Sequence, residues 1–191
     1  DLHFLIRQVV FLLLALVLAQ FIMKLPMKKI EELSSSVFLV AVFLLLLVLI
    51  PHVGKTINGS SRWLGFGPVA LQVSEFAKFA TILYLAGYLV RQNSQIQAHL
   101  AGFIKPLCVL ALVVLLLLKE PDFGASIVII ATAMGMMFLA GMRISYFILL
   151  LVVIGCLFTA IAISSPYRLL RIASFMHPWV NEYGSGYQLT Q

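Results

Sequence analysis

The sequence predicts an all-α, polytopic integral membrane protein, a helical bundle with about six transmembrane helices. Two observations lead to this prediction. Of the 191 residues, 62% are hydrophobic and only 10% are charged, and the mean hydropathy is +1.09. Soluble domains are about half apolar and about a quarter charged. The apolar residues also form runs long enough to cross a bilayer core about 30 Å thick, so a soluble domain is excluded.

Each apolar run is bounded by a charged residue, a proline or a glycine. In lipid they must be helices, because an open strand edge would leave backbone amides unpaired. We expect the whole chain, 1–191, to be a single transmembrane domain. The expected spans are residues 9–23, 37–53, 69–90, 103–118, 123–142 and 144–163.

The connections between these runs give two sets of loops on opposite sides of the membrane. Residues 24–36, 91–102 and 141–143 lie on one side, and residues 1–8, 54–68, 119–122 and the tail lie on the other. Lys and Arg near the span ends are equally numerous on both sides, so the positive-inside rule chooses no orientation. The net charge of +6 favours anionic partners, lipid phosphates before nucleic acid. The alternative is that the basic residues anchor helix ends at lipid headgroups.

An acidic and a basic residue open the span 69–90. Glu75 and Lys78 lie one helical turn apart on one face. Ionisable groups at membrane depth are costly and usually face a protein interior or a cavity, which makes this pair a functional candidate. The alternative is an ion pair at the helix mouth, with Ser74 as the N-cap and Glu75 stabilised by the helix dipole.

The loop 54–68 is rich in turn-forming residues and places Arg62 beside Trp63. A guanidinium suits a phosphate, and an indole suits a sugar face or the membrane interface. From composition alone, an aromatic-belt Trp with a headgroup-anchoring Arg is an equal alternative.

The segment Glu120-Pro121-Asp122 separates two spans. We expect Pro121 in the first turn of a new helix and Asp122 at its positive end, with acid or base catalysis by the two carboxylates as the lesser alternative. Cys108 and Cys156 fall inside apolar runs, where we expect buried apolar side chains. The four histidines show no metal-ligand spacing, so we predict no metal site and no cofactor, and leave a divalent cation open.

Four segments together resemble the SEDS (shape, elongation, division and sporulation) family. They occur in the family's order and spacing over nearly the whole chain, and the last is more similar to the division member than to the elongation member. The segments are Asn58–Leu64, Gln72–Lys78, Glu120–Gly124 and Pro178-Trp179 with Gly184–Gln188.

The resemblance implies a ten-helix, multi-pass protein of the bacterial inner membrane at the division septum. Family members polymerise lipid II, the undecaprenyl-pyrophosphate-linked precursor, into glycan strands by inverting glycosyl transfer. They work with a class B penicillin-binding transpeptidase and other divisome proteins, not with nucleic acid. The resemblance also places residues 54–68, the Pro121-Asp122 segment and residues 164–191, the start of a large periplasmic loop, on the periplasmic side.

Five residues match family positions around the central cavity, and the resemblance implies that they bind substrate: Arg62, Trp63, Glu75, Lys78 and Asp122. The family's proposed catalytic aspartate lies downstream of Gln191, so the resemblance implies no catalytic residue in this chain. The chain lacks an initial Met and stops in a polar run, so we expect a fragment that is inactive alone. Two other functions stay open, a lipid II flippase and a divisome scaffold.

Overall fold

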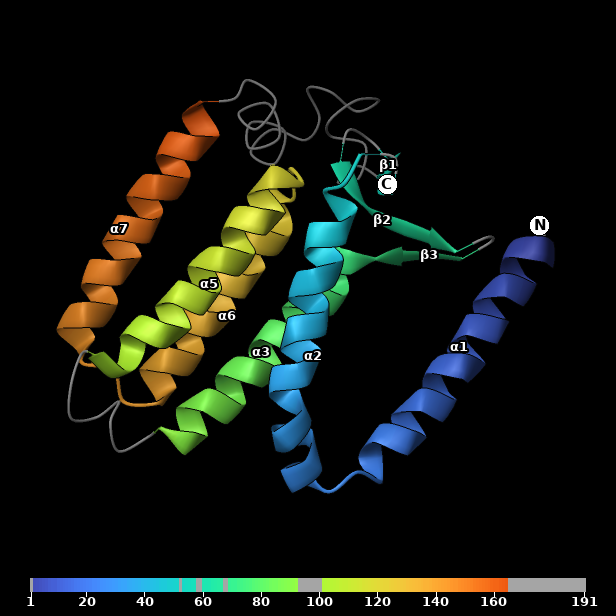
Figure 1. Cartoon of the computed structure of the whole chain (residues 1–191), viewed down its shortest axis with the longest axis horizontal. Helices are drawn as coiled ribbons and strands as arrows, with labels where there is room; N and C mark the ends of the chain where they lie inside the picture. Colours follow the sequence, from blue (N-terminus) through green and yellow to red (C-terminus); the bar gives the residue numbers. More distant parts are fainter. Residues whose placement is uncertain (1, 52, 58–59, 67–68, 93–100, 165–191) are drawn as a thin grey trace. The chain divides into compact units, whose positions relative to one another are not determined.

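The computed structural model describes residues 2–51, 53–57, 60–66, 69–92 and 101–164. The described part contains helices α1 (Leu2–Met23), α2 (Met27–Val48), α3 (Val73–Arg91), α5 (Ala101–Lys119), α6 (Phe123–Leu139) and α7 (Ile144–Ile163), and strands β1 (Lys55–Ile57), β2 (Ser60–Phe66) and β3 (Val69–Gln72) (Figure 1). The chain forms two compact units, residues 1–141 and 142–191, so α7 is described by itself. The predicted all-α membrane architecture is confirmed, and the strands of the described part all lie in one loop.

Five of the described helices are long and apolar enough to cross a membrane, which makes the chain a multi-pass membrane protein. They contain Leu5–Met23, Met27–Val48, Val73–Arg91, Gly102–Lys119 and Ile144–Ile161. The sixth, α6, has 17 residues. At a rise of about 1.5 Å per residue it is about 25 Å long, the lower limit for a span.

Three helices begin well away from the expected residues. α1 begins at Leu2 and not at residue 9. α2 begins at Met27, far before residue 37, because Pro26 has a backbone conformation suited to a helix start and the polar turns that follow also form helix. α3 begins at Val73 and not at residue 69, because residues 69–72 pair as strand β3.

A small antiparallel sheet in the order β1-β2-β3 occupies the loop between α2 and α3. We had expected only a turn-rich loop there. Ile57 pairs with Ser60 and Phe66 pairs with Val69, so two-residue connections join the strands. Two-residue connections are the commonest in hairpins, and Asn58-Gly59, which lies outside the described residues, is a favoured sequence for one.

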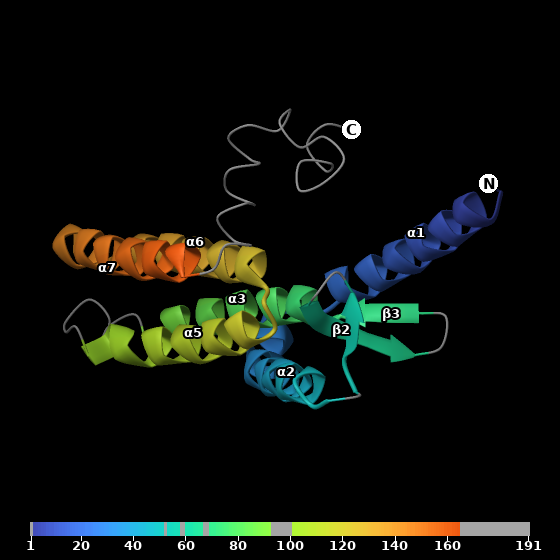
Figure 2. The same cartoon turned by 90° about the horizontal axis from the view of Figure 1, so that it is seen from above.

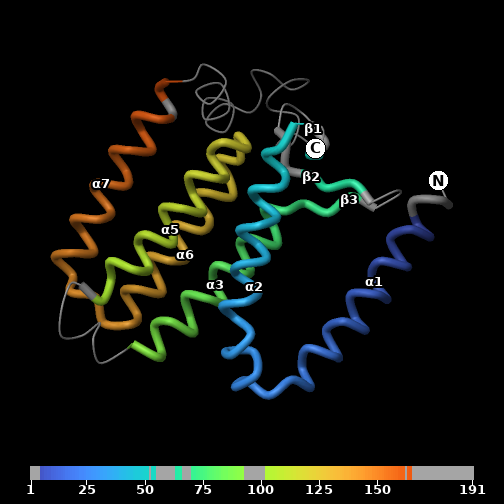
Figure 3. The backbone as a smooth tube through the Cα atoms, viewed as in Figure 1, coloured from blue at the N-terminus to red at the C-terminus, as the bar shows by residue number. Residues whose placement is uncertain are grey.

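In the first unit, α3 packs on α2, α5 and α6 (Figures 1 and 2). Figure 3 traces the chain from α2 through the sheet into α3. α2 and α3 are antiparallel, and the rings of Phe38 and Tyr84 stack across them with centroids 4.7 Å apart. An apolar side chain gains little by leaving lipid for a neighbouring helix, because both surroundings are apolar. Close packing must therefore hold this helix pair together. The fully buried Ala77 and Ala80 of α3 permit that close approach.

The buried residues of α2 follow a spacing of four and three along the helix. This spacing places one narrow stripe against a neighbouring helix. The stripe consists of Ser34, Phe38, Ala41, Leu45 and Val48.

Other apolar surfaces of the described helices face outward. The spanning windows of α1 and of α7 have no buried residue. Cys108 of α5 and Cys156 of α7 are exposed, which corrects the expectation that both thiols are buried. Both cysteines lie among apolar residues of a spanning helix, where the surrounding medium is lipid and not water.

We predict that Gly54→Ala destabilises the protein by about 1 to 3 kcal/mol, the usual range for overpacking. A Cβ at Gly54 would lie 2.5 Å from the backbone oxygen of Val48 at the end of α2, where no flexible side chain can yield. Thermal unfolding of the full-length protein in detergent measures the effect. Gly135→Ala is the matched control, because a Cβ at Gly135 has no neighbour within 4 Å. Equal stability of the two variants would contradict the prediction.

Candidate functional site

The first turn of α3 continues directly from strand β3. Gln72, the last residue of β3, is the N-cap and makes no side-chain capping bond. Its amide Nε2 instead donates to Ser74 Oγ at 3.1 Å, and Ser74 is fully buried. The expectation that Ser74 is the N-cap is therefore wrong. The strand supplies the residues before the helix, so Ser74 lies inside its first turn.

Glu75 and Lys78 form the ion pair that their spacing predicted, with Lys78 Nζ donating to Glu75 Oε1 at 2.8 Å. The Lys78 side chain is 21% exposed and that of Glu75 is 60% exposed. A pair this open adds little to stability. The ion pair orients the mostly buried Lys78 ammonium, while the Glu75 carboxylate remains exposed.

Asp122 is the N-cap of α6. Its Oδ1 accepts a hydrogen bond from the backbone nitrogen of Ala125 at 3.2 Å, and Ser126 Oγ donates to its backbone oxygen at 3.0 Å. The residue is 4% exposed. The predicted helix start is confirmed, except that Pro121 precedes the N-cap and does not lie in the first turn.

A second carboxylate lies at the same junction between α5 and α6. Glu120 is fully buried, and its backbone nitrogen donates to the oxygens of Leu116 and Leu117 in the last turn of α5. Burying an ionised carboxylate is costly without strong partners. A fully buried Glu120 is therefore unusual in an otherwise apolar bundle.

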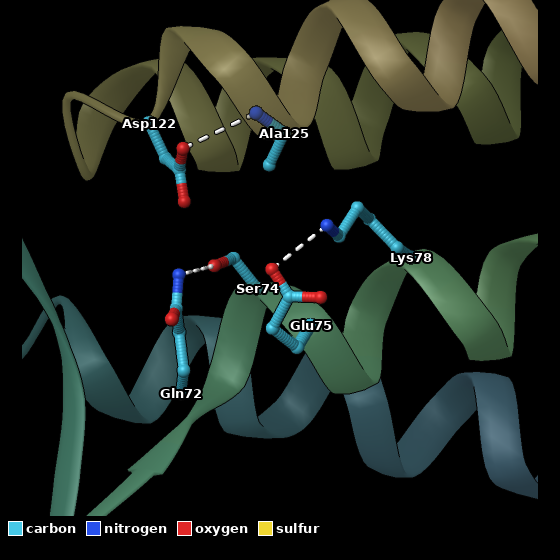
Figure 4. Close-up of polar contacts among 6 residues, drawn as sticks. All are labelled: Gln72, Ser74, Glu75, Lys78, Asp122 and Ala125. Carbon is cyan, nitrogen blue, oxygen red and sulfur yellow. Dashed lines mark hydrogen bonds and ion pairs between the residues drawn. The ribbon is translucent and has the colours of Figure 1, made fainter. Parts of the chain in front are cut away.

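The starts of α3 and α6 face each other (Figure 4). The two helices pack together and run in the same direction (Figure 1), so their N-terminal ends lie at one end of the unit. In the close-up, Lys78 extends from α3 towards α6, and the Asp122 carboxylate points towards α3 (Figure 4). Each helix N-terminus carries about half a positive charge. Two such ends and one ammonium supply local positive potential here, and the carboxylates of Glu75, Glu120 and Asp122 lie against it.

The sheet connects the loop residues to the same end of α3. Trp63 in β2 pairs with Gln72 of β3, the N-cap of α3, and its side chain is half-buried. Side chains of directly paired residues lie on one face of a sheet, so Trp63 and Gln72 are neighbours. Arg62 precedes Trp63 in β2, but its side chain lies outside the part that the structure describes.

The structure therefore places Glu75, Lys78 and Asp122 at the starts of α3 and α6, and Trp63 on β2, which packs on α3. Sequence reasoning missed Gln72, which couples the sheet to α3 through Ser74. The Asn-Gly connection could have indicated the sheet, and the sheet would have given the register. Among the described residues, no group of His, Cys, Asp or Glu could hold a metal ion.

The family model described as "Cell cycle protein" (FTSW_RODA_SPOVE) matches residues 1–191, the whole chain. A Legionella pneumophila protein named "Probable peptidoglycan glycosyltransferase FtsW" is 49% identical over 189 residues, which are 99% of this chain and 48% of that protein. A protein of the same name from Coxiella burnetii is also 49% identical over 189 residues, 99% of this chain and 51% of that protein. The chain thus spans about half the length of these curated relatives.

Solved structures share the fold. A chain from "Structural coordination of polymerization and crosslinking by a peptidoglycan synthase complex" matches with a TM-score of 0.78 and 29% identity, covering 96% of this chain and 54% of that one. The crystal structure of the rod shape determining protein RodA from Thermus thermophilus matches with a TM-score of 0.65 and 29% identity, covering 79% of this chain and 49% of that one.

We predict that Asp122→Ala lowers the stability of the full-length protein by about 1 kcal/mol, whereas Asp122→Asn keeps it within about 0.5 kcal/mol. Asn retains the side-chain oxygen that accepts from Ala125 but carries no charge. Thermal unfolding in detergent compares the two variants. If Asn destabilises as much as Ala, the cap is not what holds the start of α6.

Proposed function

Because the chain belongs to the FtsW/RodA/SpoVE family of cell cycle proteins, which is the SEDS family that its motifs resemble, we propose that the whole protein is a peptidoglycan glycosyltransferase. Its substrate is lipid II, and its product is the glycan strand of the septal wall. The names of the relatives from Legionella pneumophila and Coxiella burnetii support this activity. The observation that carries the proposal is the Lys78 ammonium at the joined starts of α3 and α6.

The site suits the chemistry of glycosyl transfer from a pyrophosphate. A base removes the proton of the acceptor sugar hydroxyl, and the oxygen attacks the anomeric carbon. The bond from that carbon to the pyrophosphate oxygen breaks, the configuration inverts, and undecaprenyl pyrophosphate leaves with the bonding electron pair. Negative charge grows on the leaving group, so preorganised positive charge beside it lowers the barrier.

Each candidate site residue has a role in this scheme. Lys78 and the two helix starts face the pyrophosphate, and Glu75 keeps Lys78 oriented. Trp63 offers its indole to a sugar face or to the membrane interface, and Arg62 adds positive charge from the same strand. Asp122 holds the start of α6 in place. The base is an aspartate beyond Gln191, as the resemblance implies.

The same proposal covers the setting of the protein. We place it in the bacterial inner membrane at the division septum, with ten spans in the whole protein and with the sheet and Asp122 on the periplasmic side. The similar structure of a peptidoglycan synthase complex, in which polymerisation and crosslinking are coordinated, supports a class B penicillin-binding transpeptidase as the partner. Other divisome proteins complete the assembly.

We predict that Lys78→Ala lowers lipid II polymerisation about a hundredfold, the usual cost of losing one preorganised charge or donor at a transition state. Lys78→Arg retains the charge and should restore part of the rate. The assay uses the full-length protein with its transpeptidase partner, and glycan strands are resolved by gel. Lys105→Ala is the control, because Lys105 is an exposed lysine near the other end of the bundle, in the first turns of α5.

Three outcomes separate the candidate functions. Wild-type rates in Lys78→Ala would remove Lys78 from the site. Movement of lipid II across sealed vesicles without glycan strands would replace the polymerase with a flippase. Normal division after Glu75 and Lys78 are both neutralised would favour a scaffold.

A further inference from the structure

The end of α3 remote from Lys78 makes three contacts with neighbouring helices, which we call the end clamp. Arg91 Nη1 lies 3.4 Å from Glu31 Oε1 of α2, a residue 60 positions earlier in the chain. Tyr88 donates from its hydroxyl to the backbone oxygen of Gly102 in α5 at 3.2 Å. Gly87 faces α2 so closely that a Cβ there would lie 3.2 Å from Ser34 Oγ.

The end clamp favours one alignment of α2 against α3, which the apolar contacts along the two helices do not select strongly. Lipid tails are as apolar as leucine, so burying Leu45 or Leu85 does not by itself select one alignment of α2 and α3. A slip of one turn, about 5.4 Å, would break the stacking of Phe38 on Tyr84 but would still leave apolar side chains in contact. The ion pair and the contact at Gly87 are specific to position, so they distinguish the observed alignment from its neighbours.

The alignment of α3 decides where Lys78 lies. α3 is one continuous helix from Val73 to Arg91, so a displacement at one end is carried to the other. Lys78 and Arg91 are about 20 Å apart along the axis at ~1.5 Å per residue. α3 also packs on α6, whose N-cap is Asp122, so sliding of α3 would move Lys78 past that N-cap.

We propose that Arg91 and Glu31 are positioning residues: their ion pair fixes the alignment of α3 against α2 and so places Lys78 at the start of α6. This inference rests on the proposed function only for its activity readout. Both side chains are 39% exposed, and ion pairs this open add little to folding stability. Reversing one charge should therefore leave a folded protein in which the alignment has changed.

Charge exchange tests the pair in the full-length protein. Arg91→Glu and Glu31→Arg each place like charges together, and each should lower lipid II polymerisation about threefold to tenfold. The double exchange restores the attraction and should recover the rate, as should the conservative Arg91→Lys. Glu32→Arg is the matched control, because Glu32 is exposed and adjacent to Glu31.

A distance measurement tests the alignment without any activity. Every native cysteine is replaced, including Cys108 and Cys156, and spin labels are placed at Leu46 of α2 and Phe79 of α3. Both positions are exposed, so the labels do not disturb the packing. Either single reversal should shift the label distance by up to about 5 Å, one helical turn. The double exchange should return it to the wild-type value.

An unchanged label distance in both single reversals would overturn the proposal. So would failure of the double exchange to restore the distance. If the wild-type protein makes no glycan strands, the proposed function fails, and the label distances still decide the role of the pair.

Discussion

Close packing of α2 against α3 is the interaction on which the rest of the first unit depends. In lipid, moving an apolar side chain from the bilayer to a helix interface gains little free energy. The pair is therefore held by close packing and by a few polar contacts. The four-three stripe of α2, the stacked rings of Phe38 and Tyr84 and the buried alanines of α3 provide the fit. α3 in turn packs on α5, α6 and strand β2. The positions of the site residues therefore depend on how α2 and α3 pack.

Part of the positive potential at the site comes from helix dipoles, which avoid the free-energy cost of placing further charged side chains in the membrane. Apart from one lysine, the site's positive potential comes from two helix starts, which the fold places together because α3 and α6 run in the same direction. Asp122 is committed to capping α6, and Glu75 is committed to Lys78. Under the proposed function, a pyrophosphate would share the Lys78 ammonium with Glu75, which already accepts from it.

Sequence patterns predicted what depends on composition and local chemistry. Apolar runs predicted the helices, five of which are long and apolar enough to span a membrane in the described part of the chain. The spacing of Glu75 and Lys78 predicted their ion pair, and Pro121-Asp122 predicted the start of α6. The sheet was missed because glycines and serines mask its short alternation, and Ser74 was misassigned as a result. The pairing of Glu31 with Arg91 could not be predicted, because it joins residues far apart in the chain and depends on how the helices align.

The central claim is that the joined starts of α3 and α6 receive the pyrophosphate of lipid II beside Lys78. The most direct measurement is a structure of the full-length protein, with its transpeptidase partner, bound to lipid II. The account predicts a phosphate oxygen within about 4 Å of Lys78 Nζ, the range of an ion pair. A pyrophosphate bound elsewhere, with Lys78 still paired to Glu75 alone, would contradict it.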